Sequence, residues 1–297
     1  MQFVRIEDFG KLPARQRDGH KGDYGRVLVV GGSRRMIGAP ALAANGALRG
    51  GAGLVTVASP ATVQLAVAML CQCATSVPLT CQKTGKQELS PEAVVQFRAI
   101  AEGCDILAIG PGLAVGQGQE MLIRAALEQE KPLVLDADGL NNLARIDNWP
   151  GLRRCPLVLT PHPGELARLT GTTSDAVQAG RQQAADQALA DWLGRSQTDK
   201  PMVLVLKGAG TIVTDGQRSY VNETGNPGMA TGGTGDVLTG LVAGLAMQGL
   251  DLFTAASLAT YTHGLAGDLA ATAGTEEAAI ATDLLDHIPQ AMQKIVD

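Results

Sequence analysis

Residues Gly225–Gly240, GNPGMATGGTGDVLTG, join a glycine-rich loop to the start of an apolar helix. Gly232, Gly233 and Gly235 can adopt backbone conformations that other residues avoid, and can thereby turn successive N–H groups toward one point. Together with the dipole of the helix that follows, these donors predict an anion-binding site that needs no cationic side chain. The stretch also marks a change in the chain, because strand-like runs precede it and helical segments follow it.

Asp236 stands at the start of that helix, where two interpretations compete. Aspartate is a good N-cap residue, and such a cap stabilises a helix by about 1 kcal/mol. A cap does not require the preceding run of glycines, whereas a site of phosphoryl transfer uses such a loop to grip the phosphate. We therefore predict that Asp236 is the catalytic base, which accepts the proton of an attacking hydroxyl.

Short runs rich in Val, Leu and Ile alternate with helical stretches over most of the chain. This alternation predicts a mostly parallel sheet with helices on both faces and a ligand crevice at the carboxyl ends of the strands. Two further runs around Asp215-Gly216 predict an antiparallel hairpin at one sheet edge. Because no repeat, linker or composition break interrupts the chain, we expect residues 1–297 to form one three-layer α/β/α domain. The parallel runs are RVLVVGG from Arg26, LVTVAS from Leu54, DILAIGPG from Asp105, PLVLDADG from Pro132, LVLTPHPGE from Leu157 and MVLVLKG from Met202.

The amino-acid composition favours some classes of protein and argues against others. The 297 residues are 45% hydrophobic but only 3% aromatic, which is typical of parallel sheets covered by helices. The formal charge of −5 argues against a nucleic-acid partner or a membrane surface, because clustered Lys and Arg hold those partners. We find no signal peptide and no membrane-spanning apolar run, and we expect a cytoplasmic protein. The five cysteines form an odd set without a C-x-x-C pair and are interpreted as structural thiols.

Two common nucleotide-binding motifs, the P-loop and the strict G-x-G-x-x-G fingerprint, do not occur in the sequence. Five other segments, in order along the chain, resemble the NAD(P)H-hydrate dehydratase family of the ribokinase-like superfamily, which implies the three-layer ribokinase-like fold. The first segment begins at Lys21, so the chain resembles the stand-alone dehydratase without the fused epimerase domain that family members often carry. The five segments are KGDYGRVLVVGGSRRMIGAPALAANGALRGGAGLVTV, DADGLN, LTPHPGE, LKGAGTIV and GNPGMATGGTGDVLTG.

The resemblance implies four contacts to the substrate, a hydrated nicotinamide nucleotide: Ala39, Gly112, His162 and Asp236. The stretch around Ala39 could also be a buried Ala-rich helix, and both interpretations can hold because a small residue permits close approach of a ligand. Gly112 could instead belong to an ordinary strand-to-helix turn. His162 lies between two prolines, which stiffen the loop and would hold the imidazole at the crevice.

The resemblance also implies an adenine-nucleotide site and a metal ligand. Glu165 resembles a glutamate near Mg²⁺, and a first-turn helix carboxylate is the alternative. Asp136 and Asp138 are interpreted as supporting polar residues. The remaining histidines, interpreted as structural or surface residues, are His20, His263 and His287. The nucleotide-site residues, for which a hairpin loop with a solvated lysine is the alternative, are Lys207, Gly208, Ala209, Gly210, Thr211 and Gly235.

The activity that the resemblance implies is ADP-dependent dehydration of the S epimer of hydrated NADH or NADPH, with release of AMP and phosphate. Asp236 would deprotonate the ring hydroxyl, which attacks the terminal phosphate of the nucleotide, and the ring nitrogen would then expel phosphate. ADP is expected rather than ATP, Mg²⁺ is the implied cofactor, a separate epimerase is the implied pathway partner, and a homotetramer is usual in the family. Two alternatives stay open: a vitamin-precursor kinase of the same superfamily, and a nucleotide-sensing module that has lost catalysis.

Overall fold

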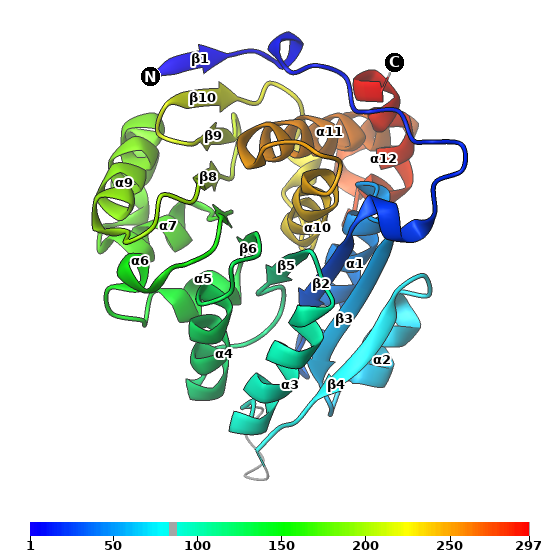
Figure 1. Ribbon diagram of the computed structural model, residues 1–297. Helices are drawn as coiled ribbons and strands as arrows, with labels where there is room; N and C mark the ends of the chain where they lie inside the picture. Colours follow the sequence, from blue (N-terminus) through cyan, green and yellow to red (C-terminus); the bar gives the residue numbers. More distant parts are fainter. Residues whose placement is uncertain (83–87, 297) are drawn as a thin grey trace.

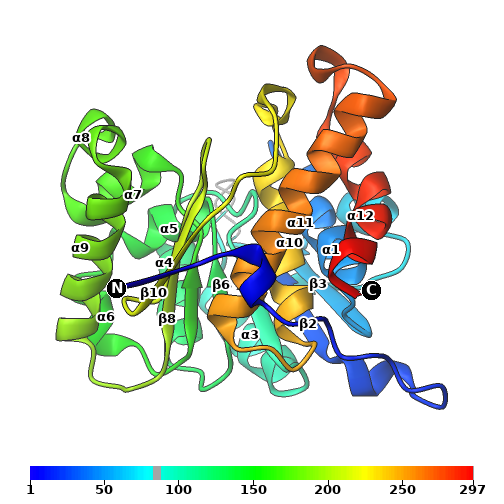
Figure 2. The ribbon, with the colours of Figure 1, turned by 90° about the horizontal axis from the view of Figure 1, so that it is seen from above.

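The computed structural model describes residues 1–82 and 88–296, which build a ten-stranded sheet between two layers of helices (Figures 1 and 2). The strand order is β1-β10-β9-β8-β7-β6-β5-β2-β3-β4. Neighbours from β8 to β4 pair in parallel, whereas β9 is antiparallel to both β8 and β10. The three-layer α/β/α prediction is therefore confirmed, including the antiparallel hairpin near one edge.

The strands are short and mostly buried, as expected for a sheet covered on both faces. All six parallel runs expected from the sequence form strands. Their bounds are β2 Arg26–Val30, β3 Leu54–Pro60, β5 Ile106–Ile109, β6 Leu133–Leu135, β7 Leu157–Leu159 and β8 Met202–Leu206. The hairpin consists of β9 Ile212–Thr214 and β10 Arg218–Val221, and the two outer strands are β1 Gln2–Val4 and β4 Thr75–Leu79.

Successive side chains of β2 divide the core between the two faces of the sheet, because strand residues alternate in direction. Val27 and Val29 pack with one helical layer, and Leu28 and Val30 pack with the other. Figure 2 shows the two layers on opposite sides of the sheet. The first layer comprises α1 Gly38–Arg49, α2 Gln64–Leu70, α10 Thr234–Ala246, α11 Leu252–Ala273 and α12 Ala281–Val296. The second comprises α3 Pro91–Glu102, α4 Gln117–Leu127, α5 Asp138–Leu143, α6 Trp149–Leu152, α7 Pro163–Thr170, α8 Ser174–Ala179 and α9 Arg181–Arg195.

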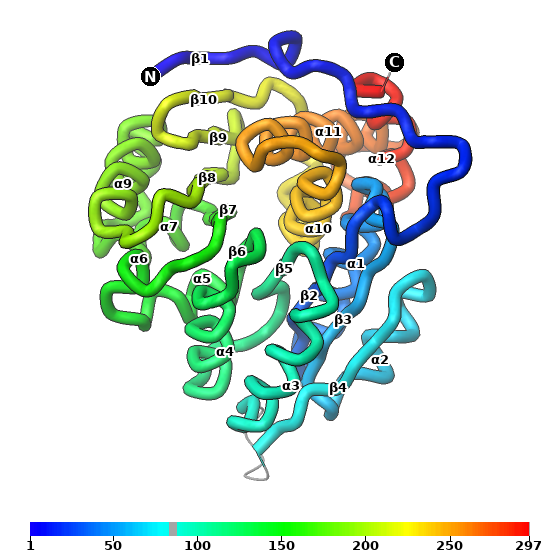
Figure 3. Tube along the Cα trace, in the orientation of Figure 1, coloured from blue at the N-terminus to red at the C-terminus, as the bar shows by residue number. Residues whose placement is uncertain are grey.

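The amino-terminal segment crosses the molecule beside β10, α11 and α12 (Figure 3). Its β1 extends the sheet beyond the hairpin, so the antiparallel pair is one strand removed from the edge that we expected it to form. Phe9 packs against the rings of Tyr220 and Phe253, and the Leu12 N–H donates to the carbonyl of Ile295 over 3.0 Å. In the described ranges, the chain contains no helix with the length and apolar character needed to cross a membrane.

Candidate active site

The residues predicted from five separate motifs follow neighbouring strands of the sheet. Lys207 follows β8, His162 follows β7, Asp136 follows β6 and Gly112 follows β5. Ala39 lies in the first turn of α1, the helix that follows β2. Because the carboxyl ends of parallel strands meet at one edge of a sheet, these residues form one crevice, with Lys207 and His162 at its β8–β7 end and Gly112 and Ala39 at its β5–β2 end.

The glycine-rich loop delivers free backbone donors to this crevice. Gly233 caps α10 with a φ of 97°, and a side chain there would collide with Leu42. Within the described ranges, the N–H groups of residues 233–236 donate to no protein acceptor, and the first bond of the helix runs from the Val237 N–H to the Gly233 carbonyl. Four unpaired N–H groups at the positive end of a helix dipole make an anion site.

Asp236 lies in the first turn of α10, and among the described residues no donor forms a hydrogen bond with its carboxylate. Burial, together with the negative charge of Asp136, raises the pKa of Asp236 to about 7, against the attraction of Lys207. The carboxylate does not cap the helix, because the N-cap position belongs to Gly233. A side chain with this pKa can take up or release a proton near neutral pH, as a general base must.

Asp136 is the buried centre of the charge network beneath Asp236. It is 1% exposed, and its two carboxylate oxygens accept from Lys207 Nζ over 2.5 Å and from Thr239 Oγ1 over 2.6 Å. Lys207 Nζ also lies 3.9 Å from Glu165 Oε2. Burial opposes the charge of Lys207, but the two carboxylates raise the net pKa of its ammonium, which therefore stays charged. Asp136, which we interpreted as a supporting residue, thus connects β6, β8 and α10.

A cavity of about 500 Å³ contains the whole predicted nucleotide site. Lys207 and the four residues after it form one wall, the segment from Asn222 to Ala230 supplies another, and Thr234 and Gly235 bring the free N–H groups of α10 to it. A nucleotide's phosphates would meet both the Lys207 ammonium and these donors, because a Cβ on Gly235 would lie only 3.4 Å from Lys207 Nζ. The cavity therefore suits a ligand that ends in phosphate groups.

Of the predicted substrate residues, Gly112 and Ala39 lie together at the β5–β2 end of the crevice, whereas His162 follows β7, next to β8. Gly112 has a φ of 63°, and a Cβ there would come within 2.6 Å of the Met36 Cβ and 3.1 Å of the Ala39 Cβ. His162 is the N-cap of α7, and its Nδ1 accepts from the Gly164 N–H over 3.0 Å. In this tautomer Nε2 carries the hydrogen; it lies 3.5 Å from Glu165 Oε1, and the side chain is 55% exposed, so a ligand in the crevice can reach the ring.

Glu165 caps the start of its own helix, α7, and also takes part in the charge network around Asp136. Its Oε2 accepts from the His162 backbone N–H over 2.8 Å, which completes a capping box at the start of α7. The side chain is 6% exposed, and burial raises the pKa of Glu165 against the opposing charge of Lys207. Glu165 thus acts as a first-turn carboxylate of α7, which was the alternative to a metal ligand. Over the described ranges, no group of three His, Cys, Asp or Glu side chains is arranged to hold a metal ion.

His263 lines the nucleotide cavity, although no sequence motif assigned it there. Its Nε2 lies 2.8 Å from the carbonyl oxygen of Thr234, the first residue of α10. Burial lowers the pKa of His263 to about 4, so the ring is neutral at physiological pH. The only sequence signal was that His263 and Asp268 stand beside small residues in a helix whose other residues are apolar, Ser, Thr or Tyr.

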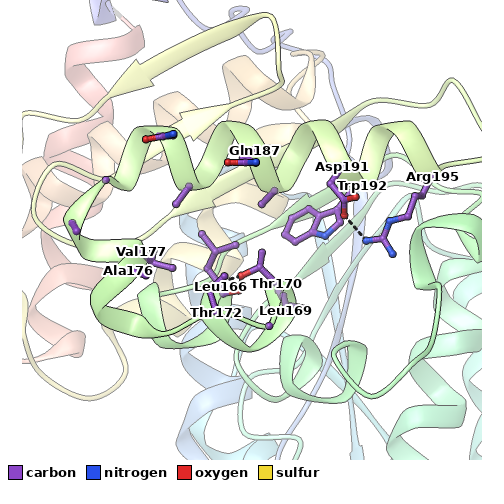
Figure 4. Close-up of a pocket in the computed structure, with 16 residues that line it drawn as sticks. Leu166, Leu169, Thr170, Thr172, Ala176, Val177, Gln187, Asp191, Trp192 and Arg195 are labelled. Atoms are coloured by element: carbon purple, nitrogen blue, oxygen red, sulfur yellow. Dashed lines mark hydrogen bonds and ion pairs between the residues drawn. The ribbon is translucent and has the colours of Figure 1, made fainter.

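A second cavity, of about 930 Å³, lies between α7, α8 and α9 (Figure 4). Leu166 and Trp192 contribute apolar walls, and Asp191 and Arg195 at its rim form an ion pair with each other at 2.6 Å. None of the predicted catalytic or binding residues lines this cavity. The crevice at the carboxyl edge of the sheet therefore remains the candidate active site.

Solved structures with the same architecture define the class to which this fold and site belong. An ADP/ATP-dependent NAD(P)H-hydrate dehydratase from Bacillus subtilis, co-crystallised with ATP and Mg²⁺, shares 29% identity, with coverage of 96% of this chain and 95% of that chain and a TM-score of 0.81. A ribokinase-like superfamily protein from Enterococcus faecalis shares 26% identity, with coverage of 99% and 96% and a TM-score of 0.79. The chain thus has the ribokinase-like fold, as the motifs predicted.

A family model described as NAD(P)H-hydrate dehydratase matches residues 27–290. The chain belongs to this family. The bifunctional NAD(P)H-hydrate repair enzyme of Moorella thermoacetica is 45% identical over 288 residues, which are 96% of this chain and 52% of that protein. The corresponding enzyme of Coxiella burnetii is 41% identical over 94% of this chain and 53% of that protein. The chain spans about half the length of the curated relatives that it matches.

Proposed function

We propose that this protein removes water from the S epimer of hydrated NADH and NADPH at the expense of ADP, releasing AMP and phosphate. The observation that carries the proposal is the arrangement around Asp236. A partly buried carboxylate with a pKa of about 7 stands at the mouth of α10, beside four free N–H groups and the Lys207 ammonium. This combination of a base and an anion site is what transfer of a phosphoryl group to a hydroxyl requires.

In the proposed reaction, Asp236 accepts the proton of the hydroxyl on the hydrated nicotinamide ring. The hydroxyl oxygen forms a bond to the β-phosphorus of ADP while the bond to the AMP oxygen breaks. The N–H groups of Thr234 and Gly235 and the ammonium of Lys207 stabilise the negative charge on the phosphoryl oxygens. The ring nitrogen lone pair then expels inorganic phosphate, and loss of a proton from the adjacent ring carbon restores the double bond of NADH or NADPH.

The proposed reaction gives each of the predicted site residues a role. Ala39 and Gly112 would hold the hydrated dinucleotide at the β5–β2 end of the crevice, where they leave room for close approach, and His162 would contact it from the end of β7. Residues 207–211 and Gly235 would hold ADP in the 500 Å³ cavity. Asp236 lies between the two ends, so the hydroxyl and the terminal phosphate can meet beside it.

Mg²⁺ is the proposed cofactor. The side chains around the proposed phosphate site can supply carboxylate oxygens as part of its ligands. Mg²⁺ in phosphoryl-transfer sites takes most of its ligands from phosphates and water and only one or two from carboxylates. A carboxylate-rich crevice without a preformed three-residue cluster in the described ranges matches that arrangement. Glu165 is the proposed carboxylate on the β7 side, and the ion would neutralise phosphate charge.

The decisive experiment is a coupled assay with chemically prepared NADH hydrate. Wild-type protein with ADP and Mg²⁺ should restore the absorbance of the reduced nicotinamide and release one phosphate for each NADH formed. Parallel reactions with ATP test the choice of nucleotide, and reactions with the separated epimers test the choice of S. Asp236→Asn should lower turnover by about 10²- to 10⁴-fold while retaining nucleotide binding.

Other outcomes of the assay would favour the alternatives. A stable phosphorylated product would indicate the vitamin-precursor kinase, because a kinase releases its phosphoester intact. ADP binding without turnover of any hydrate would indicate the nucleotide sensor. Full turnover by Asp236→Asn would show that another residue is the base.

We further propose that the protein is cytoplasmic, that it acts as a homotetramer of single-domain chains, and that a separate epimerase supplies the S form of the substrate. The names of the bifunctional relatives motivate the last point, since they join two repair activities in one protein. Sedimentation equilibrium would test the tetramer, and limited proteolysis would test the single domain. Addition of an epimerase to a mixture of the R and S hydrates would test the last point. Turnover of both epimers without the epimerase would contradict the proposed pairing.

A further inference from the structure

Helix α11 packs against the segment that forms one wall of the nucleotide cavity. Two glycines of the helix make this close packing possible: a side chain at Gly264 would collide with Thr224, and one at Gly267 would collide with Met229. Thr224 also donates its hydroxyl to the Tyr261 carbonyl of α11 over 2.9 Å. The cavity wall therefore rests directly on the backbone of the helix.

Asp268 of α11 holds a turn within this wall, at Gly225 and Asn226. One carboxylate oxygen accepts from the Gly225 N–H over 2.9 Å, and the other accepts from the Asn226 side-chain amide over 3.0 Å. Gly225 has a φ of 102°, a conformation that favours glycine. Hydrogen bonds to a charged acceptor are stronger than neutral ones, so this carboxylate fixes a turn that would otherwise be free to move.

His263 lies about one turn earlier on the same helix and bonds to Thr234. This residue is the far end of the stretch that begins at Gly225. A carbonyl oxygen only accepts, so the bond to Thr234 selects the tautomer in which Nε2 carries the hydrogen, and burial lowers the pKa of His263, which keeps the ring neutral. The Thr234 hydroxyl in turn donates to the carbonyl of Met229 over 3.1 Å. The bond thus fixes the residue whose N–H is one of the free donors of the anion site, two positions before Asp236.

We propose that His263 and Asp268 are positioning residues of the nucleotide site. They hold the start and the end of the segment from Gly225 to Thr234 on α11, so that the cavity wall and the free N–H groups are in place before the nucleotide binds. A preorganised site loses less conformational entropy on binding, and its affinity rises accordingly. This inference rests on the proposed nucleotide site, but it does not depend on which reaction follows.

Calorimetric titration with ADP and Mg²⁺ tests the inference without turnover. His263→Leu removes the bond to Thr234, and Asp268→Ala removes both bonds to the turn; each should raise the Kd for ADP about 10-fold. His263→Gln can place an amide N–H near the position of Nε2 and should recover most of the affinity. His287→Leu is the matched control, because His287 also bonds a backbone carbonyl over 2.8 Å but lies on α12, outside the cavity lining.

A positioning role and a general structural role give different results. In the first, the Kd for ADP rises while the KM for the hydrate at saturating ADP changes by less than about twofold. Lower thermal stability with an unchanged Kd for ADP, or an equal loss of affinity in His287→Leu, would overturn the proposal. Wild-type protein that binds ADP but turns over no hydrate would contradict the proposed dehydratase reaction and leave this inference standing, whereas wild-type protein that binds no ADP would overturn both.

Discussion

The ammonium of Lys207 lies 2.5 Å from the carboxylate of Asp136, and both groups are largely withdrawn from solvent, with side chains 19% and 1% exposed. The pair joins the end of β8 to the end of β6 directly beneath the first turn of α10. A buried ion pair is stable only when both partners remain, because either charge alone is strongly disfavoured in the interior. The pair therefore ties the nucleotide site to the stability of the fold.

Replacement of both partners should cost less stability than the sum of the two single replacements. Lys207→Met leaves the Asp136 carboxylate without its cation and should lower the free energy of unfolding by about 3 kcal/mol. The double variant with Asp136→Asn should recover at least about 1 kcal/mol relative to the sum of the single changes. Urea unfolding of the four proteins measures this coupling. Strictly additive losses would show that the two side chains do not interact in solution.

The pH dependence of turnover should reveal the proton held by Asp236. Burial and the charge of Asp136 raise the pKa of this carboxyl to about 7, and a general base acts only when it is deprotonated. We expect kcat/KM to rise with pH up to a plateau above about pH 7. Stopped assays from pH 5 to pH 9, corrected for the ionisation of ADP, provide the profile. A profile that is already flat at pH 5 would mean that the base has an ordinary carboxyl pKa.

The same shift predicts how stability depends on pH. Between pH 4 and pH 7, Asp236 is protonated in the folded chain but ionised in the unfolded chain, so the free energy of unfolding falls as pH rises through this window. Asp236→Asn has no charge to bury and should be more stable than the wild type at pH 8, by up to about 4 kcal/mol. At pH 3.5 the two proteins should unfold at nearly the same urea concentration. A variant less stable than the wild type at pH 8 would show that the ionised carboxylate is well accommodated in the fold.

The sequence predicted the strands that a local run of apolar residues marks. Lys207 and His162 stand near the ends of two of the parallel runs, and the resemblance to a known family, rather than the residue types alone, implied their roles. Two edge strands were missed for physical reasons. β1 has only three residues, none of which is buried, and β4 contains Pro78, which cannot donate to a neighbouring strand and weakens the strand pattern.

The spatial arrangement of the site residues could not be read from the chain. Lys207 and Asp136 are 71 residues apart, and their ion pair depends on the order of the strands, which no local motif specifies. His263 was missed because a histidine in an apolar helix more often has a structural role, and only its contact with Thr234 reveals the connection to the loop. The pairing of strands and residues far apart in the sequence therefore determined which site residues lie in contact, and the sequence motifs had left this open.

Gly112 and Gly171 offer a matched pair that separates backbone strain from crowding at the substrate end of the crevice. Both residues have left-handed backbones, with φ values of 63° and 70°, but a Cβ at Gly171 would meet nothing within 4 Å, whereas one at Gly112 would press on Met36 and Ala39. Gly171→Ala should cost about 1 kcal/mol of stability and leave turnover unchanged. Gly112→Ala should cost more and raise the KM for the hydrate about 10-fold, because displacement of Ala39 disturbs the proposed substrate contact. Steady-state kinetics and urea unfolding of both variants measure the difference, and an unchanged hydrate KM in Gly112→Ala would remove this glycine from the substrate site.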